Sequence, residues 1–255
     1  MPLLDHLIEL RNRLMYSAIT LVIAFAVCYY FSKDIYGFLT RPLADALEGQ
    51  VGRHMIFTDL TEAFFTYMKV AFWAATFIAF PIIATQLWMF VAPGLYRNER
   101  KAFLPFLLAT PVLFFTGGAL VYYVIFPLAW KFFISFEAPG GEGTLPIEVM
   151  PKVNEYLSLV MTLIFAFGLA FQLPVLLSLL ARVGLISAAD LSSKRRYAIV
   201  GIFVFAAVVT PPDVISQCSL AIPMLALYEA SIISAKIIER NRAKRAAAEA
   251  AQSAT

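Results

Sequence analysis

The stretch HLIELRNRLMYSAITLVIAF, from His6 to Phe25, joins a charged segment directly to a long apolar one. Glu9, Arg11 and Arg13 precede an uncharged run that extends from Leu14 to Phe31. A run of this length is enough for an α-helix to cross about 30 Å of hydrocarbon. The stretch therefore predicts a membrane-spanning helix with ionisable side chains at its rim.

The composition of the 255-residue chain also favours a membrane environment. It is 61% hydrophobic and only 15% charged, whereas soluble domains carry about 25% charged residues. That is more apolar side chain than one soluble core can bury. Cys28 and Cys218 lie in separate apolar runs, which predicts two free buried thiols. His6 and His54 lie far apart, so neither a metal site nor another cofactor is predicted.

Uncharged intervals predict six transmembrane helices, and hence an all-α integral membrane protein with a concave bundle. The predicted spans cover about residues 14–31, 70–92, 103–127, 156–181, 197–210 and 214–234. The last two are short, because TPPD (Thr210 to Asp213) ends one helix and favours the start of another. We expect a single domain over residues 1–235 and a disordered tail over residues 236–255.

Lysine and arginine predict the orientation of these spans. With six spans the two termini share one side, and most of the 20 Lys and Arg residues lie on that side. They cluster within residues 11–13, 97–101, 182–196 and 236–245. Such an excess on short loops is typical of the cytoplasmic face, so both termini are predicted to be cytoplasmic.

The outer loops then comprise residues 32–63 and 131–155. Apolar residues recur at helical spacing in the first of them, at Ile35, Phe38, Leu39, Leu43 and Leu47. We expect a helix that lies along the membrane interface and is broken at Pro42.

Several polar residues fall within or beside the predicted spans. Lys69 is expected to extend its amine outward, and Gln86 to form a hydrogen bond between helices. Gln172 lies near the middle of the fourth span, two residues before Pro174, which frees a backbone carbonyl near Ala170. Both a structural and a functional role remain open for Gln172.

A second polar group lies at the outer end of the sixth span. Thr210, Asp213 and Gln217 are close in sequence there. Such a shallow cluster predicts a docking point for another membrane helix.

Two carboxylates stand beside arginines at the cytoplasmic rim, and two interpretations of them remain open. Glu9 precedes Arg11 and Arg13, and Glu99 lies between Arg97 and Arg100. They form either local ion pairs, which contribute about 0–1 kcal/mol each, or a rigid receptor for a cationic ligand. Each charge-assisted bond to such a ligand contributes about 1.5–3 kcal/mol.

Four motifs resemble the TatC subunit of the twin-arginine protein translocase. They are HLIELRNRL before the first span, FVAPGLYRNER between spans two and three, FGLAFQLPV in span four, and TPPDVISQCSLAIPMLALYE in span six. The resemblance extends from His6 to about Glu229. It implies a non-enzymatic receptor and scaffold that exports folded proteins across the cytoplasmic (inner) membrane with the proton-motive force and no nucleotide.

The resemblance also implies roles for individual residues. Glu9 and Glu99 match carboxylates that recognise the paired arginines of signal peptides. Phe90 and Arg97 match positions around the same site, Arg11 belongs to the N-terminal motif, and Pro42 matches a proline of the first outer loop. Many family members carry Glu where this chain has Gln172, and a neutral amide cannot titrate.

The resemblance further implies partners. Thr210 and Gln217 match the place where single-span TatA or TatB helices dock. The other expected partners are twin-arginine signal peptides, membrane lipids and further copies of this chain, with no nucleic acid.

The main alternative function is that of a small-solute or ion secondary transporter. It predicts ionisable groups along a path through the midplane, and none lies between Glu155 and Arg182 or between Arg196 and Asp213. Solute uptake by the purified chain alone in liposomes would favour it. An intramembrane enzyme is disfavoured, since HExxH, GxSxG and paired intramembrane aspartates are missing from the sequence.

Overall fold

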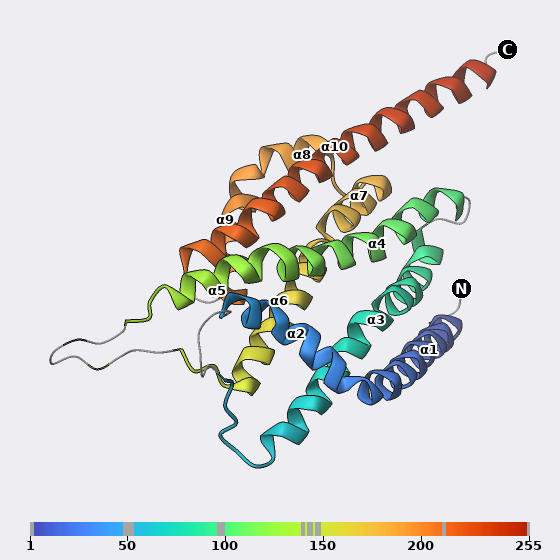
Figure 1. Cartoon of the computed structure of the whole chain (residues 1–255). Helices are drawn as coiled ribbons and strands as arrows, with labels where there is room; N and C mark the ends of the chain where they lie inside the picture. Colours follow the sequence, from blue (N-terminus) through green and yellow to red (C-terminus); the bar gives the residue numbers. More distant parts are fainter. Residues whose placement is uncertain are drawn as a thin grey trace. The chain divides into compact units, whose positions relative to one another are not determined.

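The computed structural model describes residues 3–47, 54–95, 100–138, 141, 145, 149–210 and 213–253. These residues form helices joined by loops (Figure 1). The chain divides into two compact units where the sequence predicts one domain. Unit 1 comprises Met1–Arg100 and Gly118–Ala166, and unit 2 comprises Lys101–Gly117 and Phe167–Thr255.

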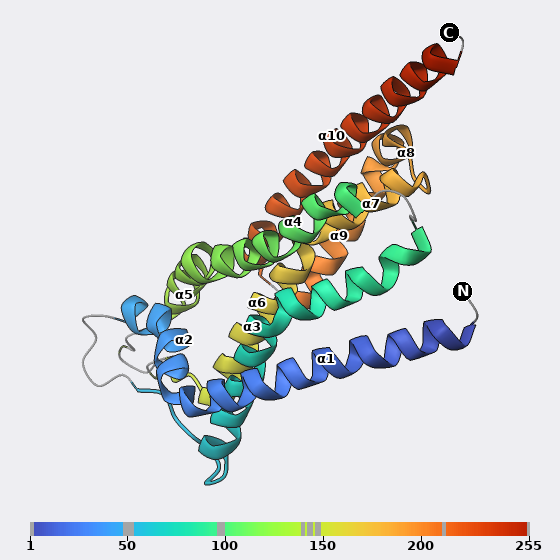
Figure 2. The same cartoon turned by 90° about the vertical axis from the view of Figure 1, so that its right-hand side faces the viewer.

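Unit 1 is built on two long helices, α1 (Leu3–Tyr30) and α3 (Glu62–Leu95). The two lie along one another (Figure 2). Cys28 on α1 and Ala71 and Ala75 on α3 form a buried cluster between them. Small side chains let two helix backbones approach closely, which is how membrane helices gain packing energy.

The remaining helices of unit 1 lie within or next to the two predicted outer loops. They are α2 (Ser32–Ala46), the last turn of α4 (Arg100–Leu120), the π-helical turn η1 (Val121–Ile125), α5 (Phe126–Ile134) and most of α6 (Val153–Ala170). Helix α2 packs against α3 and α5. It passes through Pro42 and ends only at Ala46, so the predicted break at this proline is wrong. A side chain from elsewhere in unit 1 donates a hydrogen bond to the helix carbonyl that the proline leaves without a backbone donor.

A short backbone bridge joins the two predicted outer loops. Ile56 pairs in parallel with Lys152. The N–H of Ile56 donates to the carbonyl of Pro151, and the N–H of Val153 donates to the carbonyl of Ile56, both at 3.2 Å. The loop before α3 is thereby fixed to the loop before α6.

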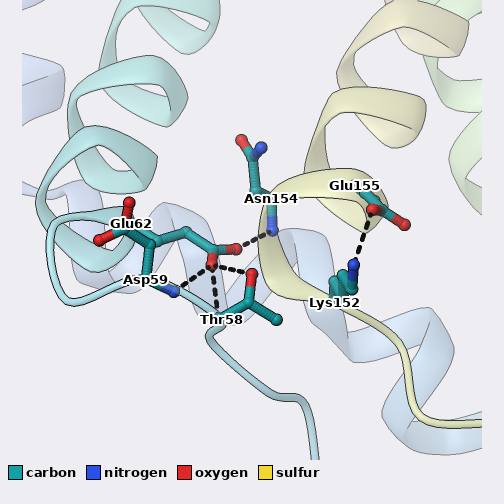
Figure 3. Close-up of polar contacts among 6 residues, drawn as sticks. All are labelled: Thr58, Asp59, Glu62, Lys152, Asn154 and Glu155. Carbon is teal, nitrogen blue, oxygen red and sulfur yellow. Dashed lines mark hydrogen bonds and ion pairs between the residues drawn. The ribbon is translucent and has the colours of Figure 1, made fainter.

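Glu62, the first residue of α3, strengthens this link (Figure 3). Its Oε2 accepts the N–H groups of Thr58 at 2.8 Å and Asp59 at 3.4 Å. Its Oε1 accepts the N–H of Asn154, in the first turn of α6, at 3.1 Å. The amine of Lys69 donates to the side chain of Asn154 at 2.8 Å. The carboxylate of Glu62 therefore holds the loop before α3 and also caps the first turn of α6.

Unit 2 is organised around α10 (Val214–Ser253), which packs against α7 (Leu173–Val183), α8 (Ala188–Ser193) and α9 (Arg195–Val209) (Figure 1). Hydrogen bonds from buried hydroxyls connect these helices. The hydroxyl of Ser178 donates to Ser234 at 2.8 Å, and the hydroxyl of Tyr228 donates to the carbonyl of Leu191 at 2.8 Å. Buried hydroxyls with partners avoid the desolvation cost of unpaired ones.

Two glycines in unit 2 occupy positions that disfavour a side chain. Helix α7 ends at Gly184, whose φ of 84° favours glycine. On α4, a Cβ at Gly117 would lie 2.7 Å from the carbonyl oxygen of Phe167. Only a residue without a side chain allows α4 and α6 to approach this closely.

A capping box begins α8. The hydroxyl of Ser187 accepts the N–H of Asp190, and the carboxylate of Asp190 accepts the N–H of Ser187, both at 3.0 Å. Hydrogen bonds from the Ser187 side chain and backbone hold the pKa of Asp190 below its ordinary value. Glu239 on α10 accepts the N–H of Ala188 at 2.7 Å, which fixes α8 to α10.

Five helical stretches of the described chain are long and apolar enough to cross a membrane. They are Leu4–Tyr30, Glu62–Phe90, Pro105–Ile134, Val153–Val183 and Val214–Lys244. Helix α9 occupies the place of the predicted fifth span and has only 15 residues, or about 22 Å of length.

The last predicted span is longer than expected. Helix α10 has 40 residues and continues through the segment for which the sequence predicts a disordered tail. No proline or glycine follows Pro223 on α10, and its final part is rich in alanine, which has the highest helix propensity.

Candidate functional site

The first candidate site lies where the N-terminal part of α1 meets the C-terminal part of α3, within unit 1. Arg13 on α1 connects the two helices. Its Nη1 donates to Oε1 of Gln86 at 3.1 Å and contacts Sδ of Met89 at 3.6 Å, and its Nη2 donates to Oε1 of Glu9 at 3.2 Å. One half-buried guanidinium therefore holds both an acidic side chain of α1 and a polar side chain of α3.

An aromatic contact lies next to this polar one. The rings of His6 and Phe90 stack with centroids 4.4 Å apart and an interplanar angle of 18°. Offset stacking of this kind contributes about 0.5–1.5 kcal/mol beyond area burial. The two contacts together fix the N-terminal turns of α1 against α3.

A groove of about 480 Å³ follows the polar face of α1. Its lining comprises Asp5, Ile8, Glu9, Asn12, Arg13 and Tyr16. Asp5, Glu9 and Arg13 share a helix face because they are spaced by four residues. The carboxylates of Asp5 and Glu9 thus line a polar groove, which suits a cationic ligand.

The structure places three of the five residues predicted for signal-peptide binding. Glu9 and Phe90 come together at the α1–α3 contact, through Arg13 and His6 respectively. Arg11 is exposed and donates to the side chain of Asn12 at 3.2 Å. Arg97 and Glu99 lie outside the described residues.

Sequence reasoning missed the parts played by Asp5 and His6, and it treated Arg13 only as a basic neighbour. The spacing of four residues from Asp5 to Glu9 and from Glu9 to Arg13 was a signal that could have found this face. The stacking of His6 on Phe90 had no such signal, because it depends on how α1 lies along α3.

The second candidate site, at Thr210, Asp213 and Gln217, lies between α9 and α10 in unit 2. The hydroxyl of Thr210 donates to the carbonyl of Ala206 at 2.8 Å. Oδ1 of Asp213 accepts the N–H of Ser216 at 2.7 Å and so caps the start of α10.

The amide of Gln217 connects the two helices of this second site. Its Nε2 donates to the carbonyl of Phe203 on α9 at 3.2 Å. The side chain therefore already has a structural contact within unit 2.

Gln172 and Pro174 form a third polar feature in unit 2. Gln172 stands at the break between α6 and α7, and Pro174 lies in the first turn of α7. Nε2 of Gln172 donates to the carbonyl of Thr110 on α4 at 2.9 Å, and not to Ala170, the carbonyl that Pro174 frees. The residue thus makes a structural bond between two helices.

None of these three sites has the composition of a metal centre. Among the residues that the structure describes, no group of three or more His, Cys, Asp and Glu side chains is placed to hold a metal ion. Both cysteines are free, with Cys28 buried and Cys218 half-buried.

Comparisons with known proteins identify the family to which this arrangement belongs. The model of the Sec-independent protein translocase protein TatC matches residues 5–223. The TatC protein of Magnetococcus marinus is 53% identical over 98% of this chain and 90% of its own length. The Escherichia coli K12 TatC protein is 42% identical over 91% of this chain and 86% of its own length.

A solved structure agrees with these sequence matches. The crystal structure of a twin-arginine translocase receptor, TatC, superposes with a TM-score of 0.76 at 36% identity. The superposition covers 92% of this chain and 99% of the chain in that crystal structure. The chain belongs to the TatC family of Sec-independent protein translocase proteins.

Proposed function

We propose that this protein is the signal-peptide receptor and central scaffold of a twin-arginine translocase, which exports folded proteins through the cytoplasmic membrane. The proton-motive force drives this export without a nucleotide or other cofactor. The chain spans the inner membrane six times, with both termini in the cytoplasm. Support comes from family membership, from the five long apolar helices together with α9, and from the distribution of Lys and Arg.

The observation that carries the proposal is the environment of Glu9. Its Oε1 binds the guanidinium of Arg13 at 3.2 Å, and its Oε2 has no hydrogen-bond partner among the described residues. Glu9 lines the groove that follows α1. A guanidinium from a signal peptide would form a charge-assisted bond there, while Arg13 and Gln86 keep the carboxylate in place.

Glu99 is the second carboxylate of the proposed site, and each carboxylate receives one arginine of the pair. Phe90, fixed by His6, gives the site an apolar edge. Arg11 and Arg97 disfavour single cations that lack the full set of contacts.

Cross-linking to a signal peptide tests this assignment. A photoreactive residue at position 9 or 99 should cross-link to a peptide with two arginines, and the yield should fall when both are lysines. Glu9→Gln and Glu99→Ala should abolish export of a folded twin-arginine precursor and leave the protein in the membrane. Glu155→Gln is the matched control, because its side chain is 72% exposed and pairs with Lys152. Normal export by both site variants would overturn the assignment.

We also propose that the cluster of Thr210, Asp213 and Gln217 docks single-span helices of the TatA and TatB type, and that copies of this chain self-associate. Support comes from the position of these polar groups at the junction of the short α9 with α10. Gln217→Leu should reduce co-purification of the partner helix.

A control is needed for this test because Gln217 also bonds α9. Glu229→Gln breaks another α9–α10 contact, the 2.8 Å pair with Arg195, and should leave co-purification intact. Equal losses in both variants would show that only helix packing is disturbed.

A further inference from the structure

Helix α2 contains a buried proline in its interior without ending there. Proline has no N–H, so the carbonyl of Phe38, four residues before Pro42, loses its helical donor. A buried carbonyl without a donor costs about 1–3 kcal/mol. The sequence-based prediction of a broken helix rests on this cost, and the structure must offset it.

Two tyrosine hydroxyls reach the carbonyls in the turn before Pro42. The hydroxyl of Tyr122 donates to the carbonyl of Phe38 at 2.8 Å, and the hydroxyl of Tyr156 donates to the carbonyl of Leu39 at 2.9 Å. The donors come from η1 and α6, which are 84 and 117 residues away from their acceptors. Two elements from elsewhere in unit 1 thus supply hydrogen bonds at the site of the missing one.

Ring packing holds both hydroxyls in place. Tyr122 and Tyr156 are only 8% and 5% exposed. The ring of Tyr122 stacks on Phe38 with centroids 4.3 Å apart and an interplanar angle of 6°. The ring of Tyr156 packs against Trp130 at 5.2 Å. Neither hydroxyl can therefore move far from its carbonyl without disturbing the core.

The π-helical turn contributes to the direction of Tyr122. In η1 the N–H of Phe126 bonds to the carbonyl of Val121, five residues earlier. One extra residue in a turn rotates the preceding segment by about 100° relative to the helix that follows. Pro127 follows directly and cannot supply an N–H. The π-helical turn in η1 thus contributes to directing the side chain of Tyr122 toward α2.

We propose that Tyr122 is a positioning residue that replaces the backbone donor lost at Pro42, and that Tyr156, through its bond to the neighbouring carbonyl of Leu39, joins it in fixing α2 to η1 and α6. The first outer loop is then held as a rigid helix at a set orientation. The importance of this rigid helix for export rests on the proposed function. The two hydrogen bonds are observed independently of that function.

A double-mutant cycle between the hydroxyl and the proline tests the inference. Tyr122→Phe keeps the ring and removes only the donor. In the native background we expect amide hydrogen exchange over residues 36–46 of the full-length protein in micelles to accelerate about tenfold. In a Pro42→Ala background, residue 42 regains its N–H and can bond to Phe38 itself. There the loss of the hydroxyl should accelerate exchange less than about twofold.

Two further variants keep the test decisive. Tyr123→Phe is the matched control, since Tyr123 is 69% exposed and should leave exchange in α2 unchanged. Tyr156→Phe should accelerate exchange in the same segment.

Equal acceleration by Tyr122→Phe in both backgrounds would overturn the inference, as would no acceleration in the native one. Equal acceleration would mean that the hydroxyl acts independently of Pro42, and no acceleration would mean that the ring acts only by packing. Because exchange is read without a precursor protein, this test can fail while the signal-peptide assignment stands, and the reverse is also possible.

Discussion

Arg13 and Gln86 join α1 to α3 through a hydrogen bond of 3.1 Å between residues 73 positions apart. The same guanidinium holds Glu9 at 3.2 Å. The position of Glu9 therefore depends on a side chain of another helix, although the Glu9–Arg13 pair itself is local.

Replacing Gln86 by Ala should lower the free energy of unfolding in detergent by about 1 kcal/mol, because Arg13 loses a half-buried acceptor. Thermal unfolding followed by circular dichroism measures this change. Leu87→Ala serves as the control, since Leu87 is 60% exposed. Signal-peptide cross-linking from position 9 should weaken in the Gln86→Ala variant alone. Unchanged cross-linking would show that Arg13 holds Glu9 without help from α3.

Replacing Glu62 by Gln should loosen the loops before α3 and α6 together, because the carboxylate accepts bonds from Thr58, Asp59 and Asn154. An amide carries no negative charge and keeps only one acceptor oxygen. Hydrogen exchange at these three backbone amides should accelerate. Glu155→Gln is the control for charge removal on the same face, and it should leave the three amides protected. Faster exchange in only one loop would contradict the idea of a shared anchor.

Replacing Gln172 by Leu should lower the free energy of unfolding by about 1 kcal/mol through loss of the 2.9 Å bond to Thr110. The thermal midpoint in detergent measures it. Leu176→Ala, at a residue 48% exposed, should have a smaller effect. Equal midpoints for the wild type and the Gln172→Leu variant would rule out a structural role for this amide.

Replacing Asp190 by Asn should produce a pH-dependent loss of stability. The folded state holds the pKa of Asp190 below its ordinary value, so its carboxylate stabilises the fold at neutral pH. That contribution is lost as the pH falls through the folded-state pKa. The difference in thermal midpoint between wild type and Asp190→Asn should therefore shrink in strong acid. A difference that stays constant with pH would count against the capping box as its source.

The spans were the most predictable part of this fold. Uncharged runs located all five long apolar helices because a charge within hydrocarbon is costly. The helix boundary at Thr210 to Asp213 was also predictable from the sequence, since Asp213 caps α10 through Ser216.

Contacts between distant segments were not predictable from local patterns. Pro42 indicated a helix end because its cost is local, whereas the donor that removes the cost comes from Tyr122, 84 residues from its acceptor. At the candidate site, spacing could reveal the shared face of Asp5, Glu9 and Arg13. The helix–helix bond predicted for Gln86 is confirmed, but its donor could not be identified before α1 was placed on α3.

The anchor at Glu62 also constrains how the protein is made. Asn154 follows Glu62 by 92 residues, so a ribosome must synthesise α4, η1 and α5 before that carboxylate meets its last partner. During this interval the anchor of the first loop is incomplete. Biogenesis of the N-terminal half is therefore finished by a segment from the middle of the chain, and truncation before residue 154 leaves that half without its closing contact.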